Sequence, residues 1–198
     1  AGQKLTLGDM PLFVRDLPAT LAREARSNIG RPFPWGGDFS RADAVFCRLA
    51  ATNSDHGLRQ IFLRPDHERR SEPAVAEGEP CRRVIGVDKD RVCAYFRANS
   101  EFAPFGPRAL EVTVVARRDA DDRPAELALT YETREGYRDF QKGGERWTIP
   151  AGDGWQKHTW RIEDACFANR WGWHIGLVVP GADNRTFLLK EVRVAKAR

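Results

Sequence analysis

Short β-type runs separated by turn residues constrain the fold of this chain more than any other feature. From residue 44 onward, stretches rich in valine, leucine, isoleucine and aromatic side chains are divided by Gly, Pro, Asp and Asn. Within residues 110–117, Val112 and Val114 alternate with Glu111 and Thr113, so one face of the strand is apolar and the other polar. The pattern predicts an all-β sandwich of two antiparallel sheets.

The same alternation places the individual strands. The predicted strands are residues 44–50, 57–63, 81–87, 91–97, 110–117, 125–132, 145–149, 157–163, 173–179 and 187–195. In the last of these, Phe187 and Leu189 have odd numbers whereas Val192 and Val194 have even numbers, so the apolar face changes parity. A β-bulge near residues 190–191 explains the change.

Residues 1–43 differ in sequence pattern from the rest and are predicted to form an N-terminal extension to a sandwich domain at 44–198. Leu17, Leu21 and Ala25 are spaced for a short helix, and Pro18 stands where a first helical turn tolerates proline. A Pro, Gly and aromatic-rich stretch at 30–39, which contains Trp35, has no regular period. It is interpreted as a linker or as a strap over a sandwich edge.

Composition narrows the class of partner. The 198 residues suit one sandwich, and no apolar run approaches the roughly 18 residues of a membrane helix. The formal net charge of +4 comes from arginines scattered among acids, so no continuous basic strip predicts nucleic-acid binding. An acidic glycan is the more natural anionic partner, and a simple solvated surface is the alternative. The first residues lack a basic and an apolar signal region, so we expect that any export signal has been removed.

The four cysteines favour no metal site. They are Cys47, Cys81, Cys93 and Cys166, widely spaced and without a CxxC pair or a histidine at zinc-ligand intervals. Two disulfides in an exported protein and four buried free thiols both remain open.

Several segments together resemble the jelly-roll modules attached to secreted bacterial glycoside hydrolases and related polysaccharide-degrading proteins. They are YFR at 95–97, LEVTV at 110–114, ALTY at 128–131, TWRI at 159–162, DACFANR at 164–170 and LLKEVRV at 188–194. The resemblance covers roughly residues 57–195. It implies a jelly-roll sandwich that binds carbohydrate or supports a catalytic domain, a secreted or periplasmic location, and other domains in a larger polypeptide. The chain departs from the pattern after residue 170, where Trp171, Trp173 and His174 replace small polar residues.

Aromatic side chains next to turns are the first candidate ligand residues, because an indole or phenol ring can stack on the C–H face of a sugar. Strand alternation assigns Trp160 and Trp173 to the core. The remaining candidates lie in loops or turn-rich connections and are Trp35, Tyr137, Trp155 and Trp171. Trp147 is interpreted as a second platform beside Tyr137.

Planar guanidinium groups suit the carboxylate or sulfate of an acidic sugar. Arg134, Arg138 and Arg170 stand near the aromatic candidates and are predicted ligand residues. His174 is added because His158 and His174, on separate predicted strands, could meet across a sheet; a structural histidine is the alternative. No cofactor is expected, and a structural calcium ion held by turn aspartates such as Asp153 or Asp164 is left open.

An enzymatic alternative depends on paired carboxylates. Glu111, Glu126 and Glu132 lie on predicted neighbouring strands and could flank a glycosidic bond. The chain carries no G-x-S-x-G elbow, and the strand motifs of jelly-roll glucanases and alginate lyases are missing. The sequence therefore predicts a non-catalytic carbohydrate-binding module, with a jelly-roll glycoside hydrolase or lyase and a purely structural module as the alternatives.

Overall fold

The computed structural model describes residues 39–63, 70–86, 92–103, 106–119, 125–138, 145–150, 154–170, 172–180 and 185–197. The predicted N-terminal helix, Trp35 and Trp171 lie outside these residues. Every described strand pairing is antiparallel. The predicted fold class, an all-β jelly-roll sandwich, is confirmed.

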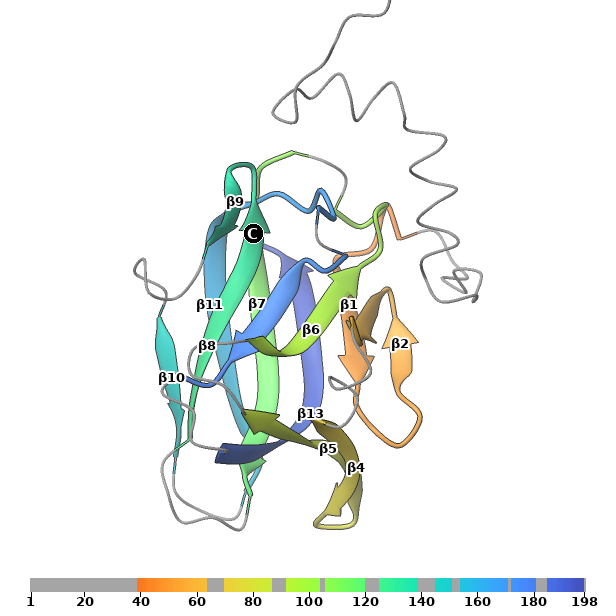
Figure 1. Ribbon diagram of the computed structural model, residues 1–198. Coiled ribbons are helices and arrows are strands. Elements are labelled where there is room, and N and C mark those ends of the chain that lie inside the picture. Colours follow the sequence, from red (N-terminus) through yellow and green to blue (C-terminus); the bar gives the residue numbers. More distant parts are fainter. Residues whose placement is uncertain are drawn as a thin grey trace, which may run out of the picture. The chain divides into compact units, whose positions relative to one another are not determined.

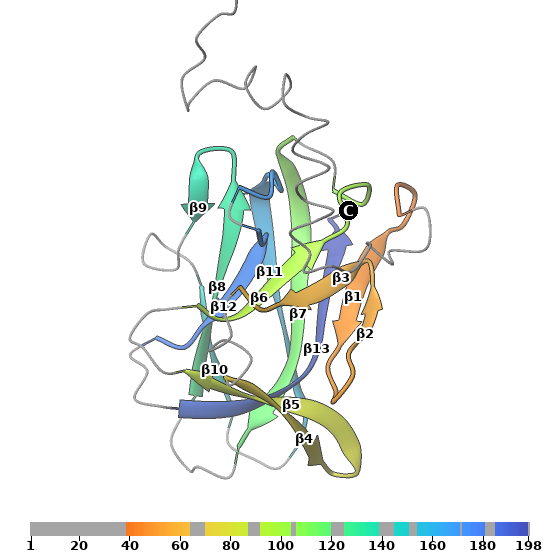
Figure 2. The same cartoon turned by 45° about the vertical axis from the view of Figure 1, so that its right-hand side comes forward.

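The strands form two layers. Their bounds are β1 Ala44–Arg48, β2 Ser54–His56, β3 Leu58–Ile61, β4 Ser71–Ala76, β5 Glu79–Gly86, β6 Val92–Ala98, β7 Arg108–Arg118, β8 Ala125–Thr133, β9 Gly136–Arg138, β10 Arg146–Ile149, β11 Gln156–Ala165, β12 Ile175–Val178 and β13 Arg185–Lys196. The front sheet has the order β8-β12-β6-β3, and β9 and β10 also pair with β8. The back sheet has the order β2-β1-β13-β7-β11, and the β4–β5 hairpin joins it through β13. Figure 1 shows β8, β12 and β6 in front of β11, β7 and β13, and Figure 2 shows β3 beside β6.

A single strand pair joins the two sheets at one end. β11 pairs with β7 along most of its length and with β8 only at Ala165 and Thr133. Between the layers, fully buried side chains such as Val112, Leu127 and Phe96 form the core. Because these residues alternate with polar ones along each strand, the predicted apolar faces pack against each other.

The predicted bulge in the last strand is confirmed. The register between β13 and β7 shifts between Leu189 and Glu191. On the other side of β13, β5 pairs with residues 185–189 and β1 with residues 191–195. The bulge therefore lies where the partner of β13 changes.

All ten predicted strands are present, and three strands are additional. β2 and β9 are three residues long, and the three residues of β2 are all exposed. β4 contains Pro73 and the exposed Glu72, which is typical of an edge strand that sequence patterns miss. It pairs with β5 through a tight turn in which Glu77 and Gly78 both have positive φ, 53° and 75°.

The described residues contain no helix long and apolar enough to cross a membrane.

Candidate functional site

Residues 166–170 and 172–174 form a loop on the outer face of the front sheet, and a buried carboxylate fixes it there. Glu132 of β8 is fully buried, and its two oxygens accept hydrogen bonds from the backbone amides of Asn169 (2.8 Å) and Arg170 (3.0 Å). Its own backbone accepts from Cys166 N (2.9 Å) and donates to the carbonyl of His174 (2.9 Å). Burial raises the pKa of Glu132, while the two amides act in the opposite direction.

His174 is the second anchor of this loop. Its backbone N donates to the carbonyl of Phe96 (2.8 Å), and its Nδ1 accepts from the amide of Ala98 (3.1 Å). The imidazole stacks on Phe167, with ring centroids 4.6 Å apart and planes 8° apart. Burial, helped by the nearby charge of Arg97, lowers the pKa of His174 to about 3, so the ring is neutral. The predicted ligand residue is 2% exposed and bridges β6 to β8.

Between these anchors, Trp173 packs on the outer face of the front sheet rather than in the core. It is 8% exposed, and its ring lies edge-to-face with Tyr95 of β6 at 5.2 Å. The two rings lie at Gly176, which pairs with both Tyr95 and Thr130. A β-carbon on Gly176 would come within 2.7 Å of Val92, 2.8 Å of Thr130 and 3.1 Å of Trp173, so only glycine permits this packing.

Trp173 is buried, as predicted, but the prediction that it shares a face with Ile175 is wrong. Residues 172–174 precede β12 and are not in a strand, so the alternation does not extend back to Trp173. We call Tyr95, Thr130, Trp173 and Gly176 together the Tyr95–Trp173 surface. Tyr95 is half-buried, whereas Thr130, Trp173 and Gly176 are buried.

The outer face of β8 is also drier than its alternation predicts. Thr130 is 4% exposed and Glu132 is fully buried, although both lie on the face expected to be wet. Ala128 and Val178 form a small apolar cluster there with Val92, separate from the core between the sheets. A covered outer face is what gives Glu132 and His174 their low-dielectric surroundings.

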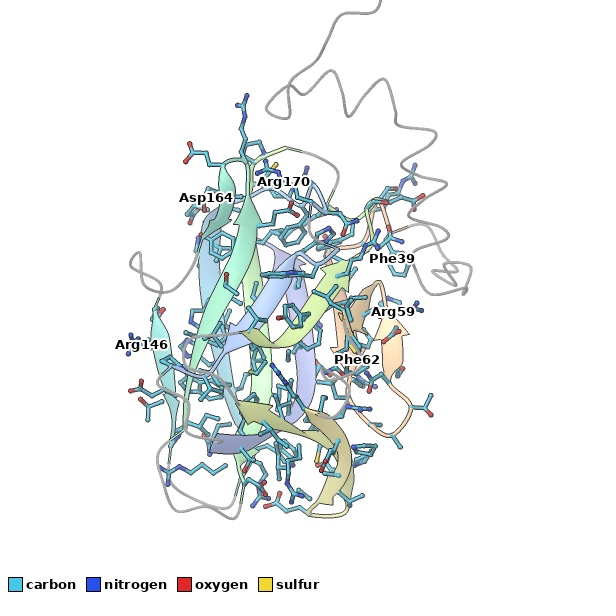
Figure 3. All side chains as sticks on the ribbon, viewed as in Figure 1. Phe39, Arg59, Phe62, Arg146, Asp164 and Arg170 are labelled. Carbon is cyan, nitrogen blue, oxygen red and sulfur yellow. The ribbon has the colours of Figure 1, made fainter. Side chains whose placement is uncertain are left out.

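Two predicted arginines meet at the rim of this surface. Arg170 donates from Nη2 to the carbonyl of Arg134, and its Nε lies 4.0 Å from Glu132 Oε1. Both residues are exposed, and Figure 3 shows Arg170 and Asp164 at the upper end of the sandwich. The backbones of Tyr137 and Arg138 pair with Glu132 and Tyr131 of β8, while their side chains lie outside the described part.

Trp155 lies at the opposite end of the back sheet. It directly precedes β11, and Arg170 follows that ten-residue strand, which at roughly 3.3 Å per residue separates the two by about 30 Å or more. Its half-buried ring has the guanidinium of Arg117 at 6.0 Å and the ammonium of Lys190 at 5.4 Å from the centroid. Arg117 pairs with Glu77 (2.8 Å) and Lys190 with Glu79, so this cluster fastens the β4–β5 hairpin to the back sheet.

The remaining aromatic candidates form a separate cluster at β10. Trp147 is 8% exposed and stacks on His158 with centroids 5.2 Å apart. Trp160 is 3% exposed, as predicted for the core, and donates from Nε1 to the carbonyl of Glu145 (3.0 Å). His158 therefore packs with tryptophans on β10 and β11, and the expected meeting with His174 does not occur.

The carboxylates proposed for an enzymatic site do not converge. Glu111 projects outward from the back sheet, whereas Glu126 pairs with Arg146 of the front sheet (3.6 Å) and Glu132 is buried under the loop. β7 and β8 are not neighbours, because β11 lies between them in the strand order. The prediction that these strands adjoin is therefore wrong.

The part of the chain that the structure describes contains no cluster of side chains for a metal site and no disulfide. No three His, Cys, Asp or Glu side chains there could hold a metal ion together. Asp164 accepts from the Tyr131 hydroxyl (2.7 Å), and Asp153 lies outside the described residues. All four cysteines are described, buried and free, which is the second of the two alternatives above.

Sequence reasoning missed Tyr95 as a site residue, although a signal for it exists. Within β6, Ala94, Phe96 and Ala98 form the core face, which leaves Tyr95 and Arg97 on the other one. A large aromatic side chain that points away from the core, on a strand whose other face is buried, is a feature that can indicate a site. The sequence signal for Trp173 is the preceding Gly172, which indicates that the regular strand does not extend to this position.

No protein-family model matches the sequence, and no curated protein is similar to it. Several solved structures are similar to the chain. A cleaved adhesin domain of Lys-gingipain from Porphyromonas gingivalis has a TM-score of 0.48 and 11% identity, over 78% of this chain and 99% of that domain. A family 29 carbohydrate-binding module from Piromyces equi has a TM-score of 0.44 and 8% identity, over 79% and 93%.

A third similar structure contains the CBM22-1 and GH10 modules of an endo-1,4-beta-D-xylanase from Clostridium thermocellum, in complex with xylohexaose. Its TM-score is 0.42 with 13% identity, and the match covers 72% of this chain but only 26% of that two-module protein. Carbohydrate-binding modules are thus among the solved structures that are similar to this chain.

Proposed function

We propose that this sandwich is a non-catalytic carbohydrate-binding module and that a sugar stacks at the Tyr95–Trp173 surface. The observation that carries the proposal is the edge-to-face pair of Tyr95 and Trp173 (5.2 Å) on the outer face of the front sheet. Tyr95 is the half-buried member of the pair, and its apolar ring face suits the C–H face of a pyranose, while the buried Trp173 packs against it. Glu132 and His174 hold the loop that carries Trp173 before any ligand arrives, which reduces the entropy lost on binding.

The arginines at the rim favour an acidic polysaccharide. Arg134 and Arg170 are exposed beside the loop, and Arg138 and Trp171 stand next to them in the chain. A guanidinium binds carboxylate and sulfate groups through paired N–H donors. We extend the proposal to an exported protein in which this module accompanies other domains, which rests on the sequence resemblance described above.

Affinity electrophoresis against neutral and acidic polysaccharides tests the proposal. We expect Tyr95→Ala to weaken binding of the retained glycan about tenfold or more, since one stacking contact contributes on the order of 1–3 kcal/mol. Trp155→Ala is the matched control and should leave binding unchanged, because Trp155 lies at the other end of the back sheet. Absence of retention on every glycan, or equal binding by wild type and Tyr95→Ala, would overturn the proposal.

A further inference from the structure

An aliphatic side chain of β3 extends the Tyr95–Trp173 surface to one side. β3 lies beside β6, and Ile61 is directly opposite Tyr95 (Figure 2). Directly opposed side chains on neighbouring strands project from the same face, with β-carbons about 4.5–5.5 Å apart. The opposed pair one position away, Gln60 and Phe96, is buried, so Ile61 lies on the outer face of the sheet. Ile61 and Tyr95 are both half-buried, and solvent therefore reaches both side chains.

Leu63 continues this apolar region just beyond the end of β3. It is 40% exposed, and the only other exposed large apolar side chain among the described residues is Val75 of β4. A β-carbon on Gly172 would lie 3.4 Å from Cδ2 of Leu63, so the leucine side chain packs beside the loop immediately before Trp173. A single exposed leucine is common on protein surfaces, whereas one that adjoins a proposed binding surface bears on what binds there.

We call Ile61 and Leu63 together the Ile61–Leu63 strip. Neither side chain donates or accepts a hydrogen bond. A sugar hydroxyl group placed against the strip loses water and gains no partner, which is unfavourable. A methyl group placed there removes apolar area from water, which is favourable. The strip therefore discriminates between a sugar that presents a methyl group to it and one that presents a hydroxymethyl group.

We propose that the sugar bound here is a 6-deoxyhexose, whose exocyclic carbon is a methyl group, and that the Ile61–Leu63 strip selects it. The inference rests on the proposed function, because Tyr95 holds the sugar ring while the strip contacts the methyl group. One cross-strand spacing separates Tyr95 from Ile61, so a methyl group bonded directly to a stacked pyranose ring reaches the strip. Binding is non-covalent.

The test uses two oligosaccharides that differ in a single oxygen atom, one ending in L-fucose and the other in L-galactose, which has a hydroxyl group on C6. Titration calorimetry with the whole chain should give about fivefold or tighter binding of the fucosyl probe by wild type. Leu63→Asn replaces the aliphatic group by an amide and should reduce this preference to about twofold or less. Val75→Asn, the matched change on the β4–β5 hairpin, should retain the full preference.

Three results would overturn the inference: no binding of the fucosyl probe, equal affinity of wild type for both probes, or a preference that Leu63→Asn and Ile61→Thr both retain. Urea unfolding establishes that the variants fold, and Ile61→Thr keeps a β-branched side chain on β3 if Leu63→Asn does not fold. If the fucosyl probe is not preferred but Tyr95→Ala weakens binding of another glycan, the proposed function stands and only the choice of sugar fails. If Tyr95→Ala weakens binding of no glycan, the proposed function fails as well.

Discussion

Trp173 and Trp155 each directly follow a glycine in the last third of the chain, yet different kinds of interaction hold the two side chains in place. Trp173 lies in a loop fixed by buried anchors, the Glu132 carboxylate and the His174 imidazole. Trp155 lies among half-exposed ion pairs of Arg117 with Glu77 and of Lys190 with Glu79. Buried hydrogen bonds whose loss leaves a partner unsatisfied are worth far more than exposed ion pairs. The difference indicates that the first tryptophan is rigidly positioned, whereas the second mainly fastens a hairpin.

Removing the Glu132 carboxylate should give the largest difference in stability between the two regions. Glu132→Ala leaves two buried amide donors without their acceptor, and we expect the free energy of unfolding to fall by about 3 kcal/mol. Glu79→Ala, the matched change on the Trp155 side, should cost less than about 0.5 kcal/mol because its ion pair is exposed. Urea unfolding measures both. Equal losses would show that the two tryptophans are anchored alike.

Acidification should destabilise the protein through His174. Its pKa is near 6.5 in the unfolded chain and is lowered to about 3 in the fold, so only the unfolded state gains the proton between these values. The stabilising contribution is complete above about pH 6.5 and is lost as pH falls toward 3, which amounts to about 2 kcal/mol between pH 7 and pH 5. Glu132, whose pKa is raised, acts in the opposite direction at lower pH.

The difference between wild type and a variant isolates the histidine. His174→Asn should flatten the pH dependence of unfolding. Unfolding curves at pH 7, 6 and 5 provide the measurement. Parallel slopes for wild type and His174→Asn would contradict a neutral buried imidazole.

Adding one methyl group in each region should give a smaller difference between their effects on the free energy of unfolding. Gly176→Ala forces Val92 and Thr130 apart beneath Trp173 and should cost about 1.5 kcal/mol. Gly154→Ala, beside Trp155, meets only the flexible end of Gln156 at 3.8 Å and should stay within about 0.5 kcal/mol of wild type. Thermal unfolding of both variants decides the matter, and a silent Gly176→Ala would mean that the outer face is loosely packed.

The fold was predictable from the sequence because the core strands alternate regularly. The ten predicted strands follow from their apolar runs between turn residues, and the bulge at residues 189–191 follows from the parity of the apolar residues. The short strands β2 and β9 and the edge strand β4 escape this reasoning, since a strand of three residues or one with a proline shows no clear alternation.

The candidate site was predictable only in part. Arg134 and Arg170 were identified from their chemistry, and the fold places them together. Tyr95 and the surroundings of Trp173 were not, because a strand's outer face is read as wet, whereas here a loop covers it. The hydrogen bonds from Asn169 and Arg170 to Glu132 connect residues 37 and 38 positions apart, which no local pattern reports.

The four buried thiols can report the order in which parts of the two sheets open. Cys47 and Cys81 belong to the back sheet, Cys93 to the front sheet, and Cys166 to the anchored loop. Burial raises the pKa of Cys93 to about 12 and also raises that of Cys47, so neither thiol exists as a reactive thiolate in the closed fold. A thiol reagent therefore modifies each position only when its segment opens, and the order of modification reports which part of the sandwich separates first.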